Sequence, residues 1–180
     1  MTSRAEDAGG AEGAAWQALE QVMDPEIPTV SVVDLGIVRE VEAVDLGRVR
    51  VAITPTYSGC PAMDVIERSV GAALSPLFAH VEVHTVLRPA WTTDWITERG
   101  RKRLEAAGIA PPGPLTPAGG SQTAGFSGRT LAVLGTTADP RCPHCQSTDV
   151  ERISEFGSTA CKALWRCRGC GDPFDAVKTL

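Results

Sequence analysis

Residues 48–77, RVRVAITPTYSGCPAMDVIERSVGAALSPL, decide the fold of the first part of the chain. Val49, Val51 and Ile53 alternate with more polar residues, which is typical of a strand with one buried face. The second half of the stretch has apolar residues at helical spacing and predicts an amphipathic helix. Cys60 lies in the loop between them, just before the helix. Because helix N-termini carry free N–H groups and a positive dipole end, we expect the Cys60 thiol to be ionised there.

The segments around this stretch predict a small mixed sheet. Residues 37–44 form a second alternating segment, and the turn at 45–47 joins the two as a β-hairpin. A third strand is predicted over 81–87, and helices over 14–23 and 93–107. A strand–helix–strand crossover makes its strands parallel, whereas the hairpin is antiparallel. The fold class we expect is α+β: a small two-layer domain with a mixed sheet covered by helices on one face.

The chain of 180 residues has room for one ordinary domain and a small appendage. We expect a disordered tail at 1–12, the α+β domain at 13–110, a flexible linker at 111–139 and a ribbon at 140–180. The linker is rich in Pro, Gly, Ser and Thr. Its one apolar island, residues 131–134, can dock on either neighbour.

Composition excludes several classes of protein. With 43% hydrophobic and 22% charged residues, the chain has the composition of a soluble globular protein. It has no apolar run of about 18 residues, so we expect no membrane span. The amino terminus does not look like a signal peptide, so we expect a cytoplasmic location, where six cysteines indicate metal or redox chemistry. A net charge of −5 argues against a general nucleic-acid binder.

Two C-x-x-C pairs near the carboxyl terminus predict a zinc ribbon. Cys142 and Cys145 form the first pair, and Cys167 and Cys170 form the second. Four thiolates can surround one Zn²⁺ tetrahedrally and leave no open position, so we expect a structural zinc. A rubredoxin-like iron site would use the same four ligands. A ribbon of about 40 residues is too small to bury a sufficient core, so the metal must supply much of its folding free energy.

A sixth cysteine, Cys161, lies outside both pairs. The residues between the pairs predict two strands, 149–156 and 160–166, around a turn. Cys161 is either a packing residue of the second strand or an extra thiol for redox or transient metal handling.

Loop residues of the first domain form a second candidate site. Asp24, Glu26, Asp34, Thr56 and Cys60 all lie where predicted helices or strands end. Taken singly, they can be turn residues, an Asx turn and a small buried hydrophobe. Taken together, they can line one cavity that handles a metal or an iron–sulfur cluster. No histidine accompanies the cysteine, so a soft metal or an iron–sulfur fragment suits the site better than hydrolysis.

Two sets of motifs carry a resemblance to known families. DPEIPTVSVVDLGIV at 24–38 and TYSGCP at 56–61 resemble the iron–sulfur cluster assembly family related to SufT, which usually has Pro where Ser58 stands. RPAWTTDWITERGRKRLEAAGIAPP at 88–112 and SEFGSTACKALWRC at 154–167, the latter with the DPF that follows it, resemble the PaaD family, whose members serve bacterial phenylacetyl-CoA epoxidases.

The resemblance implies an accessory subunit of the phenylacetyl-CoA ring-1,2-epoxidase system in aerobic phenylacetate catabolism. Such a subunit would assist metal or iron–sulfur centre maturation of the oxygenase and of its flavin- and [2Fe–2S]-containing reductase. Cys60 would hold iron or a cluster transiently, while Trp165 and Phe174, expected to be exposed, would dock the client protein.

The chain itself has no expected catalytic residue, because it lacks a Glu-x-x-His pair and a Gly-rich dinucleotide fingerprint. The alternative is a structural adaptor protein without metal-transfer chemistry. The sequence leaves open whether the small domain forms a homodimer.

Overall fold

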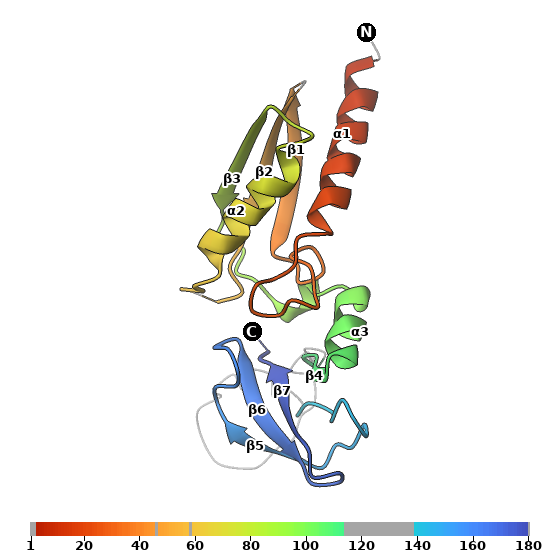
Figure 1. Cartoon of the computed structure of the whole chain (residues 1–180), viewed down its shortest axis with the longest axis vertical. Helices are drawn as coiled ribbons and strands as arrows, with labels where there is room; N and C mark the ends of the chain where they lie inside the picture. The colour runs from red at the N-terminus through yellow and green to blue at the C-terminus, as the bar shows by residue number, and fades with distance from the viewer. Residues whose placement is uncertain (1–2, 46, 58, 114–138, 180) are drawn as a thin grey trace, which may run out of the picture.

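The computed structural model describes residues 3–45, 47–57, 59–113 and 139–179. Figure 1 shows an elongated molecule with a helix-covered sheet at one end and a second sheet at the other. We call residues 3–113 the N-terminal unit and residues 139–179 the ribbon. The expected α+β fold is confirmed. Ser58 and the apolar island at 131–134 lie outside the described residues.

The N-terminal sheet has the predicted topology. Its strands β1 (Val38–Asp45), β2 (Arg48–Ile53) and β3 (His80–Thr85) lie in the order β1-β2-β3. The β1–β2 pair is antiparallel, and β3 pairs with β2 in parallel after the crossover helix α2 (Met63–Leu74). Alternation places Val49, Val51 and Ile53 in the fully buried core. The hairpin and the parallel crossover are therefore both confirmed.

The first helix lies further towards the amino terminus than predicted. Helix α1 spans Ser3–Leu19 and includes most of the segment expected to be a disordered tail. The segment is rich in Ala, the strongest helix former. A contact with the sheet also holds the helix, since Glu12 Oε1 accepts a hydrogen bond from the Ala43 backbone N–H at 3.2 Å. The prediction of a disordered tail at 1–12 is therefore wrong over the residues that the structure describes.

The helix predicted over 93–107 is broken in two. A 3₁₀ helix η1 (Thr93–Trp95) is followed by α3 (Glu98–Ala106), which lies towards the ribbon in Figure 1. Thr97 causes the break, because its backbone is extended and its hydroxyl accepts a hydrogen bond from Gly100 N–H at 3.0 Å. Thr97 is therefore the N-cap of a new helix.

The ribbon sheet contains two strands that the sequence did not indicate. Its order is β4 (Ile109–Ala110), β7 (Pro173–Val177), β6 (Lys162–Cys167) and β5 (Val150–Ser154). The pairs β5–β6 and β6–β7 are antiparallel, whereas β4 and β7 are parallel. Because β4 follows α3, the N-terminal unit supplies an edge strand to the ribbon sheet.

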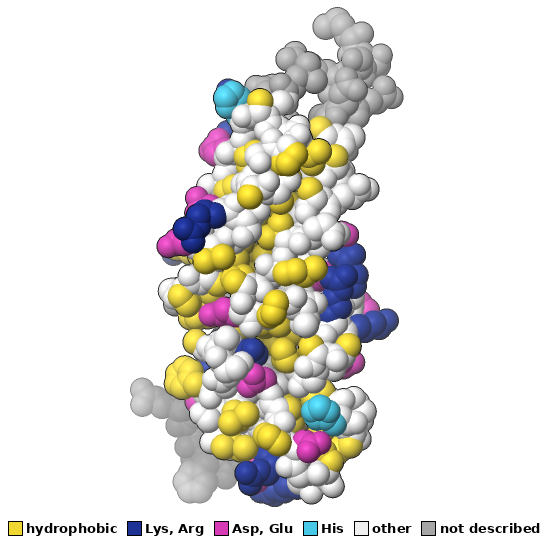
Figure 2. All heavy atoms as spheres, viewed as in Figure 1, with side chains coloured by type: hydrophobic (Ala, Val, Ile, Leu, Met, Phe, Trp, Pro, Cys, Tyr) yellow, Lys and Arg dark blue, Asp and Glu magenta, His cyan; other side chains and the backbone are white. Residues whose placement is uncertain are grey.

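Charged side chains of both signs cover the face seen in Figure 2, with Lys and Arg gathered over α3. Among the described residues, no helix is long and apolar enough to cross a bilayer.

Candidate functional site

The four cysteines of the two C-x-x-C pairs form a compact cluster. The Sγ atoms of Cys142 and Cys170 lie 3.8 Å apart, those of Cys145 and Cys167 lie 3.5 Å apart, and all four lie within 4.8 Å of one another. Four sulfurs bound tetrahedrally at about 2.3 Å would be about 3.8 Å apart. The cluster therefore fits one metal ion with little rearrangement. It is the only such group of His, Cys, Asp or Glu side chains within the described ranges.

Backbone N–H groups of the second pair favour the thiolate form that metals bind. Cys170 N–H donates to Cys167 Sγ at 3.4 Å and lowers the pKa of Cys167 to about 6. The turn continues through Gly171, whose φ of +84° is strained for any residue with a side chain.

A second site lies where the N-terminal unit meets the ribbon. A small cavity of about 20 Å³, which we call the Cys60 cavity, is lined by Asp24, Glu26, Thr56 and Cys60 from the N-terminal unit. Cys161 of the ribbon lines the same cavity. The structure thus brings together four of the five loop residues singled out by sequence, and adds the extra thiol.

Asp24 shapes the acidic side of the Cys60 cavity. Its Oδ1 accepts hydrogen bonds from the backbone N–H groups of Glu26 at 2.9 Å and Ile27 at 2.7 Å. Burial raises the pKa of Asp24, although these two donors oppose the effect. Asp24 therefore closes the turn that presents Glu26 to the cavity.

Cys60 is not activated as predicted. It lies before α2, whose N-cap is Ala62, and it is half-buried. Burial raises the pKa of the Cys60 thiol, and the charges of Glu26 and Asp24 raise it further, while the Ala62 N–H opposes them. The expectation of a thiol ionised by the helix N-terminus is therefore wrong for the metal-free protein.

Asp34 does not belong to the Cys60 cavity. Its side chain is completely buried against α3, where Oδ1 accepts from Thr97 Oγ1 and Arg99 Nε, both at 2.8 Å, and Oδ2 accepts from Arg103 Nη1 at 2.9 Å. We therefore correct its role from metal handling to anchoring α3. Two arginines four residues apart on one helix face were the signal in the sequence.

The loop after Asp34 completes this anchor. Trp91 Nε1 donates to Leu35 O at 2.9 Å, and Gly36 has a φ of +68°. A Cβ on Gly36 would lie 2.6 Å from Trp95 Cβ. Gly36 therefore permits a close approach that a larger residue would block.

Cys161 lies in the turn before β6, one residue outside the strand in which it was predicted. Its Sγ is 3.1 Å from Thr159 Oγ1 and 3.7 Å from Glu26 Oε2 in the other unit. Burial is the main cause that raises the pKa of Cys161. The thiol therefore faces the Cys60 cavity across the junction of the two units, which no local sequence pattern indicates.

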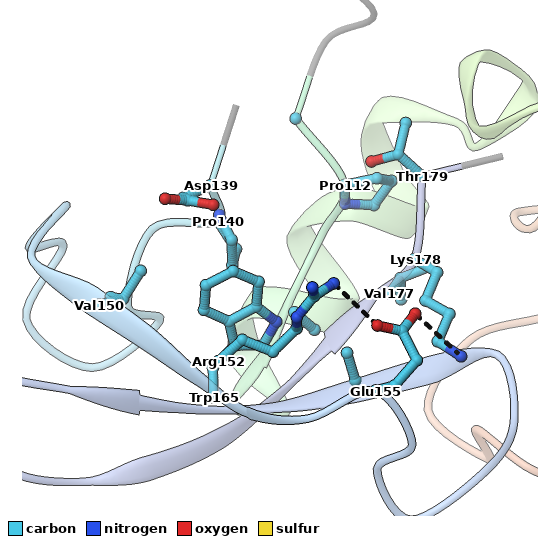
Figure 3. A pocket seen from close by; sticks show the side chains of 13 residues that line it. Pro112, Asp139, Pro140, Val150, Arg152, Glu155, Trp165, Val177, Lys178 and Thr179 are labelled. Atoms are coloured by element: carbon cyan, nitrogen blue, oxygen red, sulfur yellow. Dashed lines mark ion pairs between the residues drawn. The ribbon is translucent and has the colours of Figure 1, made fainter. Parts of the chain in front are cut away.

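The aromatic residues expected to dock a client are placed differently. Phe174 is buried in the ribbon core, so its expected exposure is wrong. Trp165 is half-buried and lines a larger cavity of about 570 Å³, shown in Figure 3. The Glu155 carboxylate in that cavity pairs with Arg152 at 2.8 Å and Lys178 at 3.7 Å. The ribbon aromatic that is exposed, at 63%, is Phe156, which the sequence did not single out.

Family comparisons agree with both parts of this architecture. Residues 12–85 match the model of the iron–sulfur cluster assembly protein family, and residues 127–178 match that of the PaaD zinc beta ribbon domain. A solved structure of a domain of unknown function, DUF59, from Bacillus anthracis is 30% identical with a TM-score of 0.53, covering 56% of this chain and 96% of that one. The class of protein is therefore an iron–sulfur-assembly-type domain joined to a four-cysteine ribbon.

A full-length relative narrows the class. An Escherichia coli protein, one of the subunits named "Putative 1,2-phenylacetyl-CoA epoxidase", is 44% identical over 166 residues, covering 92% of this chain and 91% of that protein. The Fe-S protein maturation auxiliary factor YitW of Bacillus subtilis is 42% identical over 79 residues, or 43% of this chain and 76% of that protein. The chain belongs to the PaaD family.

Proposed function

We propose that this chain is an accessory subunit of the phenylacetyl-CoA epoxidase system that assists maturation of a metal or iron–sulfur centre in its oxygenase or reductase. The observation that carries the proposal is the Cys60 cavity, where a cysteine and two carboxylates of an iron–sulfur-assembly-type domain meet. Relatives of this domain are named as Fe-S protein maturation auxiliary factors, which supports cargo handling by the same domain here. The client proteins would be the oxygenase and reductase subunits.

In this proposal the ribbon holds one structural zinc ion. Cys142, Cys145, Cys167 and Cys170 would ligate it, and the metal would supply folding free energy that the small ribbon core lacks. With four sulfur ligands there is no position for a substrate, so the chemistry of cargo binding belongs to the Cys60 cavity.

The cargo step depends on residues that hold and release a metal. Cys60 would provide the sulfur ligand, and Glu26 and Asp24 would attract the cation and stabilise the thiolate once it is bound. Because the thiol is half-buried and its pKa is raised, it is protected from unwanted oxidation until cargo arrives.

A test in cells separates this function from its alternative. In a bacterium that grows on phenylacetate, the chromosomal copy of this gene is replaced by the Cys60→Ser variant. We expect lower epoxidase activity and lower [2Fe–2S] occupancy of the reductase, at an unchanged level of the variant protein. Normal values for both would refute the proposal.

The second candidate function is a structural adaptor, favoured by the raised pKa of Cys60, which is typical of a packing cysteine. An adaptor would co-purify with the oxygenase in fixed stoichiometry. It would also lose its effect when the ribbon is deleted, but not when Cys60 is replaced by serine.

A further inference from the structure

We infer that Cys161 of the ribbon and Cys60 of the N-terminal unit together form a two-thiol site that binds a single divalent transition-metal ion, with Glu26 as the nearest carboxylate. This inference rests on the proposed function and names its cargo and its second sulfur ligand. The metal would enter as a ferrous or similar soft ion, and the ribbon would take part directly in cargo binding.

The first support is the composition of the Cys60 cavity. Both thiols line it, and Cys161 Sγ lies 3.7 Å from Glu26 Oε2 across the junction of the two units. Thiolates select soft or borderline ions such as Fe²⁺, Co²⁺ and Zn²⁺ over Mg²⁺ and Ca²⁺. Two sulfurs and a carboxylate are a donor set that suits such an ion.

The second support is uncompensated negative charge. Among the described residues, neither Asp24 nor Glu26 has an ion-pair partner, and Glu26 accepts only from the Cys161 thiol. The two nearby lysines are engaged elsewhere, Lys162 with Asp175 at 3.6 Å and Lys178 with Glu155 at 3.7 Å. A divalent cation in the cavity would therefore meet carboxylates that no protein cation neutralises.

The third support is size. A water molecule needs about 10–15 Å³ of such space, and the cavity offers about 20 Å³. One ion fits, whereas a cluster of two irons and two sulfides does not. The cargo of this site is therefore a single ion, and any cluster would be built elsewhere.

The site is less organised than the four-cysteine cluster, and this suits transfer. Only the ribbon cysteines have ligand atoms all within 4.8 Å of one another among the described residues, so Cys60, Cys161 and Glu26 must rotate to close on an ion. Binding replaces the two thiol protons, so each ion bound to two thiolates releases two protons to solvent. The reorganisation makes the site weaker than the ribbon cluster, so the ribbon fills first.

Cobalt titration of the full-length protein tests the inference. The reduced, anaerobic protein carries one zinc per chain, and Co²⁺ is then added while thiolate-to-cobalt absorption and proton release are recorded. We expect one further ion per chain and two protons per ion. Cys161→Ser and Cys60→Ser should each weaken binding by at least about tenfold, since loss of even an outer partner of a metal ligand costs about 10–100-fold. Each variant should also release one proton per ion instead of two.

The controls make each outcome decisive. Retention of one zinc per chain shows that the ribbon is folded and that cobalt has not replaced its metal. Glu67→Gln, an exposed change on α2, should bind cobalt as the parent does, while Glu26→Gln should bind more weakly. Unchanged affinity, absorption and proton release in Cys161→Ser would overturn the inference and leave the Cys60 function standing. If both thiols bind cobalt but Cys60→Ser cells keep full epoxidase activity and cluster occupancy, the proposed function fails and the site remains.

Discussion

Replacing Asp34 by Asn should destabilise the protein without changing the Cys60 cavity. Asp34 is completely buried and accepts three side-chain hydrogen bonds, two of them from arginines that are 45% and 40% exposed. The asparagine amide can replace one oxygen, but its NH₂ group would face the Arg103 donor at the Oδ2 position.

The magnitude follows from these contacts. A hydrogen bond to a charged group contributes about 1.5–3 kcal/mol, and a buried unsatisfied donor costs about 1–3 kcal/mol. Water can solvate the exposed arginines after the change, which reduces the loss. We therefore expect the free energy of unfolding to fall by about 2–4 kcal/mol.

Urea unfolding monitored by tryptophan fluorescence measures this loss at constant zinc content. The matched control is Asp94→Asn, an exposed change that should stay within about 0.5 kcal/mol of the parent. Two results would contradict the assignment of Asp34 as an anchor. One is a loss below about 1 kcal/mol. The other is unaltered stability combined with weaker cobalt binding at the Cys60 cavity, which would return Asp34 to the metal-handling site.

Three further changes test other parts of the structure. Glu26→Gln removes a charge that raises the pKa of Cys60, so more thiolate forms at a given pH and iodoacetamide should modify Cys60 faster between about pH 7 and 8; an equal rate would contradict this. Gly36→Ala should lose at least about 2 kcal/mol, because its φ is +68° and the new Cβ would lie 2.6 Å from Trp95 Cβ, whereas Gly10→Ala in open space on α1 should be stabilising by about 0.5–1 kcal/mol in urea unfolding. Chelating the ribbon metal, or protonating its thiolates with acid, should unfold the ribbon while β1–β3 keep their hydrogen-exchange protection; loss of protection in both sheets would show that they unfold together.

Features encoded by short-range spacing could be predicted from the sequence. The alternation in β1 and β2 indicated the hairpin, and the spacing of the two C-x-x-C pairs indicated the four metal ligands. Both signals arise within a few residues of one another, where backbone geometry alone determines which side chains share a face.

Features that depend on contacts between distant segments could not be predicted. Cys161 and Glu26 meet across the junction of two units, and their sequence neighbourhoods contain no sign of each other. Strand β4 has only two residues, too few to show any periodicity. The Cys60 thiol was misjudged because burial and two acidic neighbours outweigh the local effect of backbone N–H groups. Asp34 was misjudged because a loop carboxylate can serve a metal or an arginine equally well.

The pairing of Ile109 and Ala110 with Asp175 and Ala176 limits how this protein can be divided. A ribbon produced alone would expose part of the β7 edge, and unpaired N–H and C=O groups along a strand invite association with other chains. The amino-terminal half thus acts as a molecular chaperone for its own carboxyl-terminal neighbour, shielding a surface that would otherwise promote aggregation.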